Sequence, residues 1–291
     1  MSLALRRGVL PLVIAGALSA CSAPGLSLPF SEPAAAVVDG HTISMKAYQA
    51  RLEVSRHRDP FSGIPEAVPS PAPAQRLQTF TLEQLVREEI VRLEAEKRSI
   101  KVNDSAVDSR IAKLKAQAST TAFDAALQRN GFTGESFRSY QRALLTEVAL
   151  LHAMAKDRAD SAARELNASQ AFASVAARWS DDTGTFTRGG DAGWLRPGDI
   201  PEAPLAAAVE PLPAGSVTGI VPTNRGFTIA TVLERRTDQV HLAVILVLAP
   251  TVDLYSPQGT PSWFTKFIDD REAALRRAGR IELKVGNRAG G

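Results

Sequence analysis

Few residues in this chain have the types and spacing that acid–base or nucleophilic chemistry requires. Its four histidines are His41, His57, His152 and His241. His57-Arg58-Asp59 spells the kinase catalytic tripeptide, but no other kinase motif accompanies it. No G-x-S-x-G, P-loop or H-E-x-x-H pattern is present. With a single cysteine, the chain has no internal disulfide and no cysteine-ligated zinc or iron–sulfur site.

The remaining chemical candidates gather near residue 180. Asp181-Asp182 are paired acids that could bind a metal ion or lie as solvated loop carboxylates, and we favour the second interpretation. Gly189-Gly190 can adopt positive φ and allow a close backbone approach. Asp191 can accept hydrogen bonds from loop amides. We therefore expect a glycine-rich loop over residues 184–198 that holds no metal and no cofactor.

Helical spacing of apolar residues dominates the first half of the chain, and strand-like runs are added in the second half. A hairpin around Asp39-Gly40 and a proline-rich loop over residues 59–74 interrupt the first half. We predict helices over residues 44–54, 80–94, 103–114, 123–130, 135–156, 162–179 and 263–277. We predict strands over residues 219–222, 227–233, 240–249 and 281–285. This pattern indicates an α+β protein with a helical module and a small antiparallel sheet flanked by helices.

Two stretches of the second half together resemble the core of a parvulin-type (PpiC) peptidyl-prolyl isomerase domain. Residues 171–194 read AFASVAARWSDDTGTFTRGGDAGW, and residues 209–234 read VEPLPAGSVTGIVPTNRGFTIATVLE. The family pattern runs F-x-x-x-A-x-x-(Y/F/W)-S-x-D, then G-G-D-x-G-W, then L-x-x-G-x-V and a final G-aromatic-His-Ile strand. The residues that match in that order are Phe172, Ala176, Trp179, Ser180, Asp182, Gly189, Gly190, Asp191, Gly193, Trp194, Leu212, Gly215, Val217, Val221, Gly226 and Ile229.

The resemblance implies where the site residues lie. Parvulins rotate an X–Pro amide, which needs no nucleophile but needs a proline pocket and polar groups that favour the twisted amide. Asp182 and Thr223 stand at the family's catalytic Cys/Asp and hydroxyl positions. The substrate-binding positions fall on Trp194, Ile200, Leu205, Phe227 and Thr228. Thr228 stands where the family's second histidine is usual.

The strand that opens a parvulin domain has no match before residue 162, but residues 240–249 resemble it. A hairpin with residues 227–233 would lay this segment antiparallel to the last parvulin strand, as a circularly permuted first strand. In that alignment Val244 stands at the family's first histidine, so both family histidines are absent. His241 would point to the opposite face of the strand, because it lies three residues away.

Residues 1–20 have the layout of a bacterial secretory signal, with Arg6-Arg7, an apolar run from Val9 to Leu18 and small residues. That run is shorter than the roughly 20 residues a membrane-spanning helix needs. Leu18-Ser19-Ala20-Cys21 resembles a lipobox, in which the signal is cut before the cysteine and the thiol is lipidated. We expect lipidated Cys21 to anchor the chain to a membrane, the alternative being a plain secretory signal with a chance cysteine. Residues 21–36 suit a tether.

The helical half resembles the chaperone module of the SurA/PrsA class of extracytoplasmic foldases. AVVDGHTIS at residues 36–44 and TLEQLVREEIVRLEAEKRSIKV at residues 81–102 carry this resemblance. It implies a SurA-like domain over residues 37–157 that is completed by residues 258–286. The parvulin-like domain would then span residues 158–250.

Composition limits the function classes. The 291 residues are 44% hydrophobic and 22% charged, as in ordinary globular proteins. The net charge of +3 includes two arginines of the expected signal, so the rest is nearly neutral and no nucleic-acid partner is expected. We expect an extracytoplasmic foldase, lipid-anchored on the periplasmic side or cell surface, that binds unfolded or proline-containing polypeptides. The alternative is a catalytically inactive chaperone or assembly lipoprotein, because both family histidines are missing.

Overall fold

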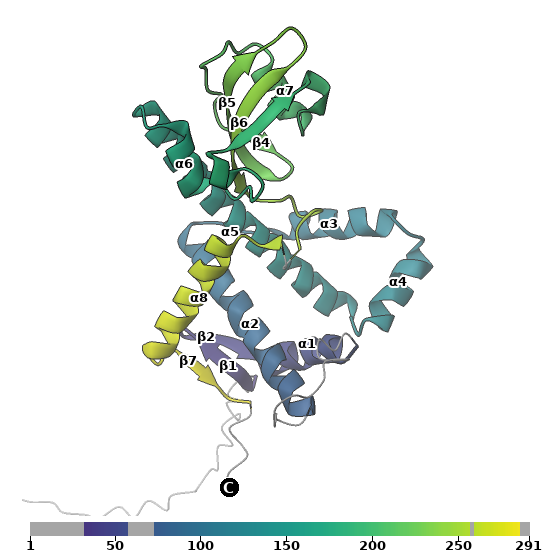
Figure 1. Cartoon of the computed structure of the whole chain (residues 1–291). Helices are drawn as coiled ribbons and strands as arrows, with labels where there is room; N and C mark the ends of the chain where they lie inside the picture. The colour runs from purple at the N-terminus through teal and green to yellow at the C-terminus, as the bar shows by residue number, and fades with distance from the viewer. Residues whose placement is uncertain (1–31, 58–72, 257–258, 286–291) are drawn as a thin grey trace, which may run out of the picture. The chain divides into compact units, whose positions relative to one another are not determined.

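The first half of the chain folds into consecutive helices, as the apolar spacing predicts (Figure 1). The computed structural model describes residues 32–57, 73–256 and 259–285. The expected signal peptide, Cys21 and most of the proline-rich loop therefore lie outside the described residues. The helices of this half are α1 (Met45–His57), α2 (Pro73–Lys97), α3 (Asp104–Ala116), α4 (Thr120–Arg129) and α5 (Gly134–Asn167).

A three-stranded antiparallel sheet accompanies these helices, in the order β2-β1-β7. Its strands are β1 (Ala34–Val38), β2 (His41–Ser44) and β7 (Ile281–Leu283). Asp39 and Gly40 form the hairpin turn with φ angles of 53° and 84°, as a two-residue turn between antiparallel strands requires. β1 begins inside the segment expected to be a tether. This part of the chain is ordered because β1 pairs with β2 on one side and β7 on the other, and its Ala35 and Ala36 are fully buried.

The C-terminal helix α8 (Ser262–Arg277) packs on the helical half. Phe264 and Ile268 are buried in the same apolar core as residues of α2 and α5. Arg87 of α2 donates to Asp269, and Arg271 donates to Glu94 of α2 at 2.7 Å. Helix α8 therefore contacts the helical half through both apolar and charged side chains.

Helix α5 differs from the sequence prediction at its C-terminal end. We predicted a helix ending near residue 156 and a second one over residues 162–179, but α5 continues for 34 residues to Asn167. Alanine favours helix most strongly, and the buried Ala159 and Ala162 carry α5 through the predicted gap. The break comes at Ser169, which has a φ of 62°, and α6 (Phe172–Trp179) follows.

A four-stranded antiparallel sheet forms the second half, in the order β3-β6-β5-β4. Its strands are β3 (Asp191–Leu195), β4 (Val221–Thr223), β5 (Gly226–Arg235) and β6 (Val240–Leu248). The expected antiparallel pairing of residues 240–249 with residues 227–233 is confirmed, and β6 also pairs with β3. β3 lies within the segment that we predicted to be a loop, residues 184–198, because β6 offers it a strand partner.

Helices cover both faces of this sheet, so the protein is of the α+β class, as predicted. Ile229 and Ile245 face α6 and the end of α5, where they pack on Val175. The other face packs on α7 (Ala203–Val209) through residues such as Val232 and Leu242. The described residues from Pro33 onward form one compact unit.

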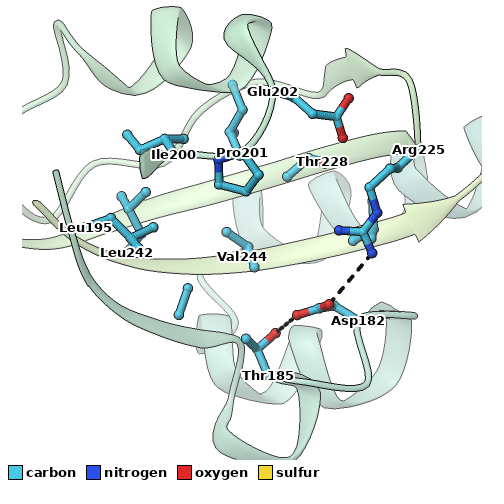
Figure 2. Close-up of a pocket in the computed structure, with 13 residues that line it drawn as sticks. Asp182, Thr185, Leu195, Ile200, Pro201, Glu202, Arg225, Thr228, Leu242 and Val244 are labelled. Atoms are coloured by element: carbon cyan, nitrogen blue, oxygen red, sulfur yellow. Dashed lines mark hydrogen bonds and ion pairs between the residues drawn. The ribbon is translucent and has the colours of Figure 1, made fainter. Parts of the chain in front are cut away.

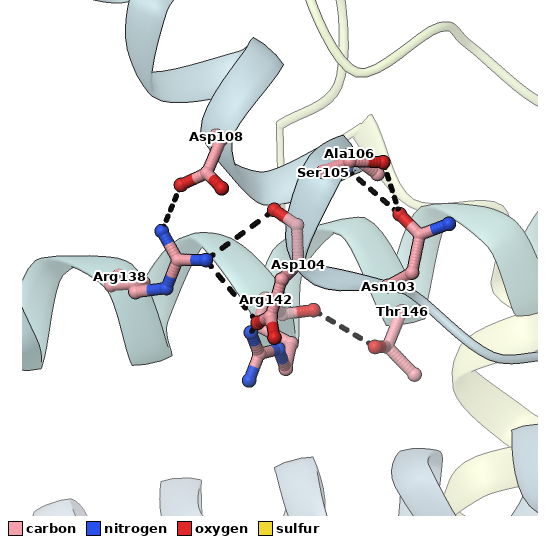
Figure 3. A network of polar contacts seen from close by, with 8 residues as sticks. All are labelled: Asn103, Asp104, Ser105, Ala106, Asp108, Arg138, Arg142 and Thr146. Carbon is pink, nitrogen blue, oxygen red and sulfur yellow. Dashed lines mark hydrogen bonds and ion pairs between the residues drawn. The ribbon is translucent and has the colours of Figure 1, made fainter.

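Helix α3 is held to α5 by charged side chains rather than by a large apolar contact (Figure 3). Arg138 and Arg142 of α5 pair with Asp104 at the start of α3, and Arg138 also pairs with Asp108. The hydrogen bond from Arg138 holds the pKa of Asp108 below its usual value. Asn103 caps the helix by accepting from the backbone N–H of Ala106 at 2.9 Å.

Candidate functional site

A cavity of about 160 Å³ lies between the β5–β6 sheet and the loop that leads into α7 (Figure 2). This volume is below the roughly 300–1,000 Å³ of pockets for drug-sized ligands, so it suits a single side chain. Its lining residues are Asp182, Thr185, Ala192, Leu195, Ile200, Pro201, Glu202, Leu205, Arg225, Thr228, Leu242, Val244 and Leu246.

The floor of the cavity is apolar because of strand alternation. Leu242, Val244 and Leu246 are spaced by two on β6, so their side chains point to the same face of the sheet. Ile200 and Leu205 line the cavity from the α7 side, opposite β6, and both are buried. The cavity is therefore shaped for an apolar group, with polar side chains along one edge.

Asp182 supplies the carboxylate of this polar edge. The hydroxyl of Thr185 donates to its Oδ2 at 2.5 Å. The backbone N–H groups of Thr185 and Phe186 both donate to the carbonyl oxygen of Asp182, at 3.1 and 3.0 Å. The carboxylate is thus held by a tight loop rather than by a regular helix or strand.

Gly190 fastens this loop to the sheet. The backbone N–H of Val244 donates to the carbonyl oxygen of Gly190 at 2.8 Å, and Gly190 has a φ of 88°. A Cβ atom at residue 190 would lie 2.5 Å from the carbonyl oxygen of Val244. The expectation that Gly189-Gly190 adopts positive φ and lets the backbone approach closely is confirmed.

Glu202 and Arg225 stand at the rim of the cavity. The carboxylate of Glu202 accepts from the backbone N–H of Asn224 at 2.5 Å and so ties the α7 loop to the β4–β5 turn. Glu202 has a φ of 68°, a conformation that costs a non-glycine residue about 1 kcal/mol or more. A guanidinium nitrogen of Arg225 lies 4.0 Å from Oδ1 of Asp182.

The structure brings together four of the residues that the sequence assigned to the site. Asp182, Ile200, Leu205 and Thr228 all line the cavity. Val244, at the place of the family's first histidine, lines it as well. Thr223 is nearby on β4, but its hydroxyl donates to the carbonyl oxygen of Gly226 at 3.1 Å and is used within the turn.

Trp194, which the resemblance placed among the substrate-binding positions, lies on the other face of the sheet and does not line the cavity. Its ring stacks on His241 with centroids 5.1 Å apart, and Arg236 lies 3.8 Å over it. The physical reason is an irregularity of β3 between Asp191 and Gly193, which shifts the strand register and turns Trp194 toward His241. His241 does point away from the cavity, as strand alternation predicts.

Phe227 also faces away from the cavity. It precedes Thr228 on β5, so it points to the opposite face of the sheet. There it packs against the core of the helical half, with its ring centroid 6.2 Å from that of His152. Phe227 therefore joins the sheet to α5 instead of lining the cavity.

Asp191 and His241 form a pair on the face that carries Trp194. The Nε2 of His241 lies 2.8 Å from Oδ1 of Asp191, which also accepts from the backbone N–H of Gly193 at 2.8 Å. The expected bond from Asp191 to a loop amide is confirmed. The hydrogen bond with His241 lowers the pKa of Asp191, with a smaller contribution from the Gly193 amide.

Asp181 is not a solvated loop acid, contrary to the interpretation we favoured. Its Oδ2 accepts from the backbone N–H of Leu248 at 2.8 Å and from the indole of Trp263 at 3.0 Å. Burial raises its pKa, and these hydrogen bonds and the charge of Arg158 oppose that rise. No sequence pattern identified this carboxylate, because its partners lie far away in the chain.

The paired acids have separate roles. Asp181 faces β6 and α8, whereas Asp182 faces the cavity. Within the described ranges, no group of three His, Cys, Asp or Glu side chains is arranged to hold a metal ion. None of the helices that the structure describes is long and apolar enough to cross a membrane.

Two protein-family models match this chain. Residues 7–151 match the SurA-like N-terminal domain, and residues 146–234 match the PPIC-type peptidyl-prolyl isomerase domain. The two matches meet on α5, the helix that passes from the helical half to the four-stranded sheet. Together they define a protein that joins a chaperone-type helical domain to a parvulin-type domain.

The chain therefore carries a SurA-like N-terminal domain followed by a PPIC-type domain, and it is similar to proteins named chaperone SurA and foldase PrsA. It is 24% identical over 282 residues to the chaperone SurA of Chromobacterium violaceum, covering 80% of this chain and 64% of the relative. It is 25% identical over 186 residues to the foldase PrsA of Geobacillus kaustophilus, covering 55% of this chain and 64% of the relative. The chain thus spans less than two thirds of the length of each.

A solved structure from work on two SurA-like chaperones of Campylobacter jejuni is also similar. It is 16% identical, and the match covers 86% of this chain and 98% of that one. The TM-score is 0.32, which is too low to add to the assignment of the fold.

Proposed function

We propose that this protein is an extracytoplasmic foldase that binds unfolded client segments through proline residues. The observation that carries this proposal is the small apolar cavity in the PPIC-type domain, with the Asp182 carboxylate along one edge. A prolyl ring is apolar and compact, so it suits a cavity of about 160 Å³ whose floor is Leu242, Val244 and Leu246. The backbone of the client would then cross the polar edge.

The reaction that this site would catalyse is rotation about the X–Pro amide. Rotation is slow because amide resonance must be lost, and it needs no nucleophile and no cofactor. An enzyme accelerates it by binding the twisted amide better than the planar one. Thr228 and Val244 offer no imidazole at the family's two histidine positions, so we expect turnover below that of ordinary parvulins.

We propose the following roles for the site residues. Asp182 provides the negative edge of the cavity, while Ile200 and Leu205 contact the prolyl ring opposite β6. Thr228 contacts the substrate backbone from β5. Thr223 supports the β4–β5 turn through its bond to Gly226 and has no direct contact with substrate.

We also infer that β6 fills the place of the parvulin first strand after a circular permutation. The PPIC-type match ends at residue 234, before β6 begins. Yet β6 runs through the interior of the sheet, between β3 and β5, and three of its residues form the cavity floor. A parvulin-like domain without this strand would lack the centre of its sheet.

A second candidate function is binding without catalysis. The observation that favours it is the pair of non-titrating side chains, Thr228 and Val244, at the positions of the family's imidazoles. In this case the protein would hold clients or assist assembly at a membrane. Peptide affinity would then be retained while the isomerisation rate stayed at the uncatalysed value.

We propose that Cys21 anchors the protein to a membrane on the extracytoplasmic side. The support is the lipobox-like Leu18-Ser19-Ala20-Cys21 behind a short apolar run. Cys21→Ala should leave a soluble or uncleaved protein, while the parent sediments with membranes and carries acyl chains detectable by mass spectrometry. Equal membrane retention of both proteins after high-salt washing, with no lipid on either, would contradict the anchor.

The central experiment measures proline-peptide binding and isomerisation with and without the cavity. Val244→Phe fills the cavity and should abolish binding of an X–Pro peptide, measured by calorimetry on the purified protein. Val217→Phe makes the same change of side chain at a residue that is 42% exposed and outside the cavity, so it should bind normally. Undiminished binding by a folded Val244→Phe protein would rule out the cavity as the client site.

A further inference from the structure

The cavity contains a group that fits the role of the missing histidines. Among the thirteen lining residues, all in the described part of the chain, Arg225 alone carries a positive charge. It comes from the β4–β5 turn, not from either strand position where the family has an imidazole. The inference below rests on the proposed function, because it concerns the same cavity.

The backbone under Arg225 is fixed from several directions. Its carbonyl oxygen accepts from the N–H of Ala249 at 2.8 Å, and the carbonyl oxygen of Asn224 accepts from the N–H of Thr251 at 3.2 Å. The N–H of Asn224 donates to Glu202, whose backbone has a positive φ. This turn therefore holds the start of the Arg225 side chain rigidly at the rim.

The guanidinium group itself has donors to spare. In the region that the structure describes it makes no hydrogen bond, and its nearest charged partner is Oδ1 of Asp182 at 4.0 Å. Figure 2 shows the side chain directed across the rim toward Asp182. The Arg225 side chain is 51% exposed, so an incoming peptide can reach it. A guanidinium carries five N–H donors and no acceptor.

Asp182 attracts the guanidinium group of Arg225 without forming a hydrogen bond with its N–H groups. Its Oδ2 already accepts from the hydroxyl of Thr185, which leaves Oδ1 facing Arg225. A separation of 4.0 Å is an ion pair but is longer than a hydrogen bond. The guanidinium is thus attracted to the polar edge while its N–H groups remain available to a ligand.

We propose that Arg225 is the catalytic hydrogen-bond donor of this site, acting on the nitrogen of the twisted X–Pro amide. In the planar amide the nitrogen lone pair is shared with the carbonyl group, so it accepts no hydrogen bond. Rotation toward 90° confines that lone pair to nitrogen, which then becomes an acceptor. A donor that bonds only the rotated form lowers the barrier without tightening ground-state binding. No covalent bond forms or breaks.

Asp182 and Glu202 are positioning residues in this proposal. Asp182 orients the guanidinium by charge, and Glu202 holds the turn that carries it. The distinction matters for their variants. Replacing either residue should lower the rate less than replacing Arg225, because the donor itself remains.

The test measures the effect of each substitution on kcat separately from its effect on peptide affinity, using the full mature chain. A proline peptide is used to measure kcat and KM by a protease-coupled assay, and its Kd is measured by calorimetry. Arg225→Ala should lower kcat about tenfold or more while Kd changes less than about threefold. This is below the hundredfold or more that a donor in a dry site is worth, because Arg225 is half exposed. Arg225→Lys should keep part of the rate, and the exposed Arg236→Ala, on the opposite face, should keep all of it.

Each other outcome overturns the proposal in a distinguishable way. An unchanged kcat in Arg225→Ala, or parallel losses of kcat and affinity, would mean that Arg225 is not a catalytic donor while peptide binding stands. Peptide binding by the parent without any turnover would overturn the catalytic role and support the binding-only function. A parent protein that neither binds nor isomerises the peptide would overturn the proposed function itself.

Discussion

The indole Nε1–H of Trp263 donates a hydrogen bond of 3.0 Å to Oδ2 of Asp181, and so joins α8 to the loop that follows α6. The same oxygen accepts from the backbone of Leu248 at the end of β6. Arg158 of α5 lies over the Trp263 ring at 4.7 Å and over the Trp179 ring at 5.1 Å. One partly buried carboxylate and one arginine therefore connect the sheet to α5 and α8.

Replacing Trp263 by Phe should destabilise the protein by about 1 kcal/mol, because the ring is kept while one hydrogen bond to a buried carboxylate is lost. Thermal or urea unfolding of the purified protein measures this change. Trp194→Phe is the matched control, since Trp194 stacks on His241 at the other face. A Trp263→Phe protein no less stable than Trp194→Phe would contradict the role of this bond.

The raised pKa of Asp181 has a defined effect on pH dependence. Because the folded pKa lies above the ordinary value of 3.8, the folded state binds this proton more tightly than the unfolded state. Its contribution to stability is fully present below pH 3.8 and is lost as the pH rises through the folded pKa. Asp181→Asn should remove this decline, seen as a difference between the two unfolding free energies across pH 3.5 to 8. Two parallel profiles would show that Asp181 does not titrate abnormally.

Gly190→Ala should disrupt both the sheet and the cavity. The added Cβ atom would lie 2.5 Å from the carbonyl oxygen of Val244, and φ is positive. We expect a loss of about 2 kcal/mol in unfolding free energy and weaker peptide binding, because Val244 lines the cavity. Gly198→Ala, which meets no atom within 4 Å, should change neither measurement. Equal behaviour of the two variants would refute the tight contact.

Trp194→Ala and Ile200→Ala should differ in peptide binding. Ile200 lines the cavity, so its truncation should weaken proline-peptide affinity about tenfold, as expected for the loss of a buried aliphatic contact. Trp194 faces His241 on the other side of the sheet, so its truncation should leave the affinity nearly unchanged. Calorimetric titration of both proteins decides the matter. The reverse order of affinities would place the binding surface on the Trp194 face.

Ending the chain at Ser256 should destabilise the helical half although none of its own residues is removed. Phe264 and Ile268 fill the core between α2 and α5, and β7 pairs with β1. We expect broad, weakly cooperative unfolding and strong binding of a hydrophobic dye. Removing only residues 286–291 is the control and should leave a sharp transition. A sharp transition in the shorter chain would refute the shared core.

The sequence predicted those parts of the fold that depend on local patterns. Apolar spacing located most of the helices, and the apolar run that forms β6 identified the buried strand. The Gly189-Gly190 motif predicted the positive φ angles of this loop, because such turns need glycine at fixed positions. These features depend on neighbours within a few residues, which a sequence displays directly.

The errors around the candidate site came from contacts between distant segments. The direction of Trp194 depends on a register shift against β6, some 50 residues later. The partners of Asp181 lie on β6 and α8, so its burial left no local sign. The sequence did not single out Arg225, because its place at the cavity depends on the position of the β4–β5 turn. Bonds to Glu202 and Ala249, which are distant in the chain, hold that turn.

Because β7 pairs with β1, the helical half can complete its fold only after nearly the whole chain has been synthesised. Residues 34–38 remain without one of their two strand partners until residues 281–283 have emerged from the ribosome or translocation pore. The four-stranded sheet, completed at residue 248, is ready first. Vectorial synthesis would therefore produce the four-stranded sheet domain before the helical module that precedes it, and an interrupted chain would expose the apolar core of α2 and α5.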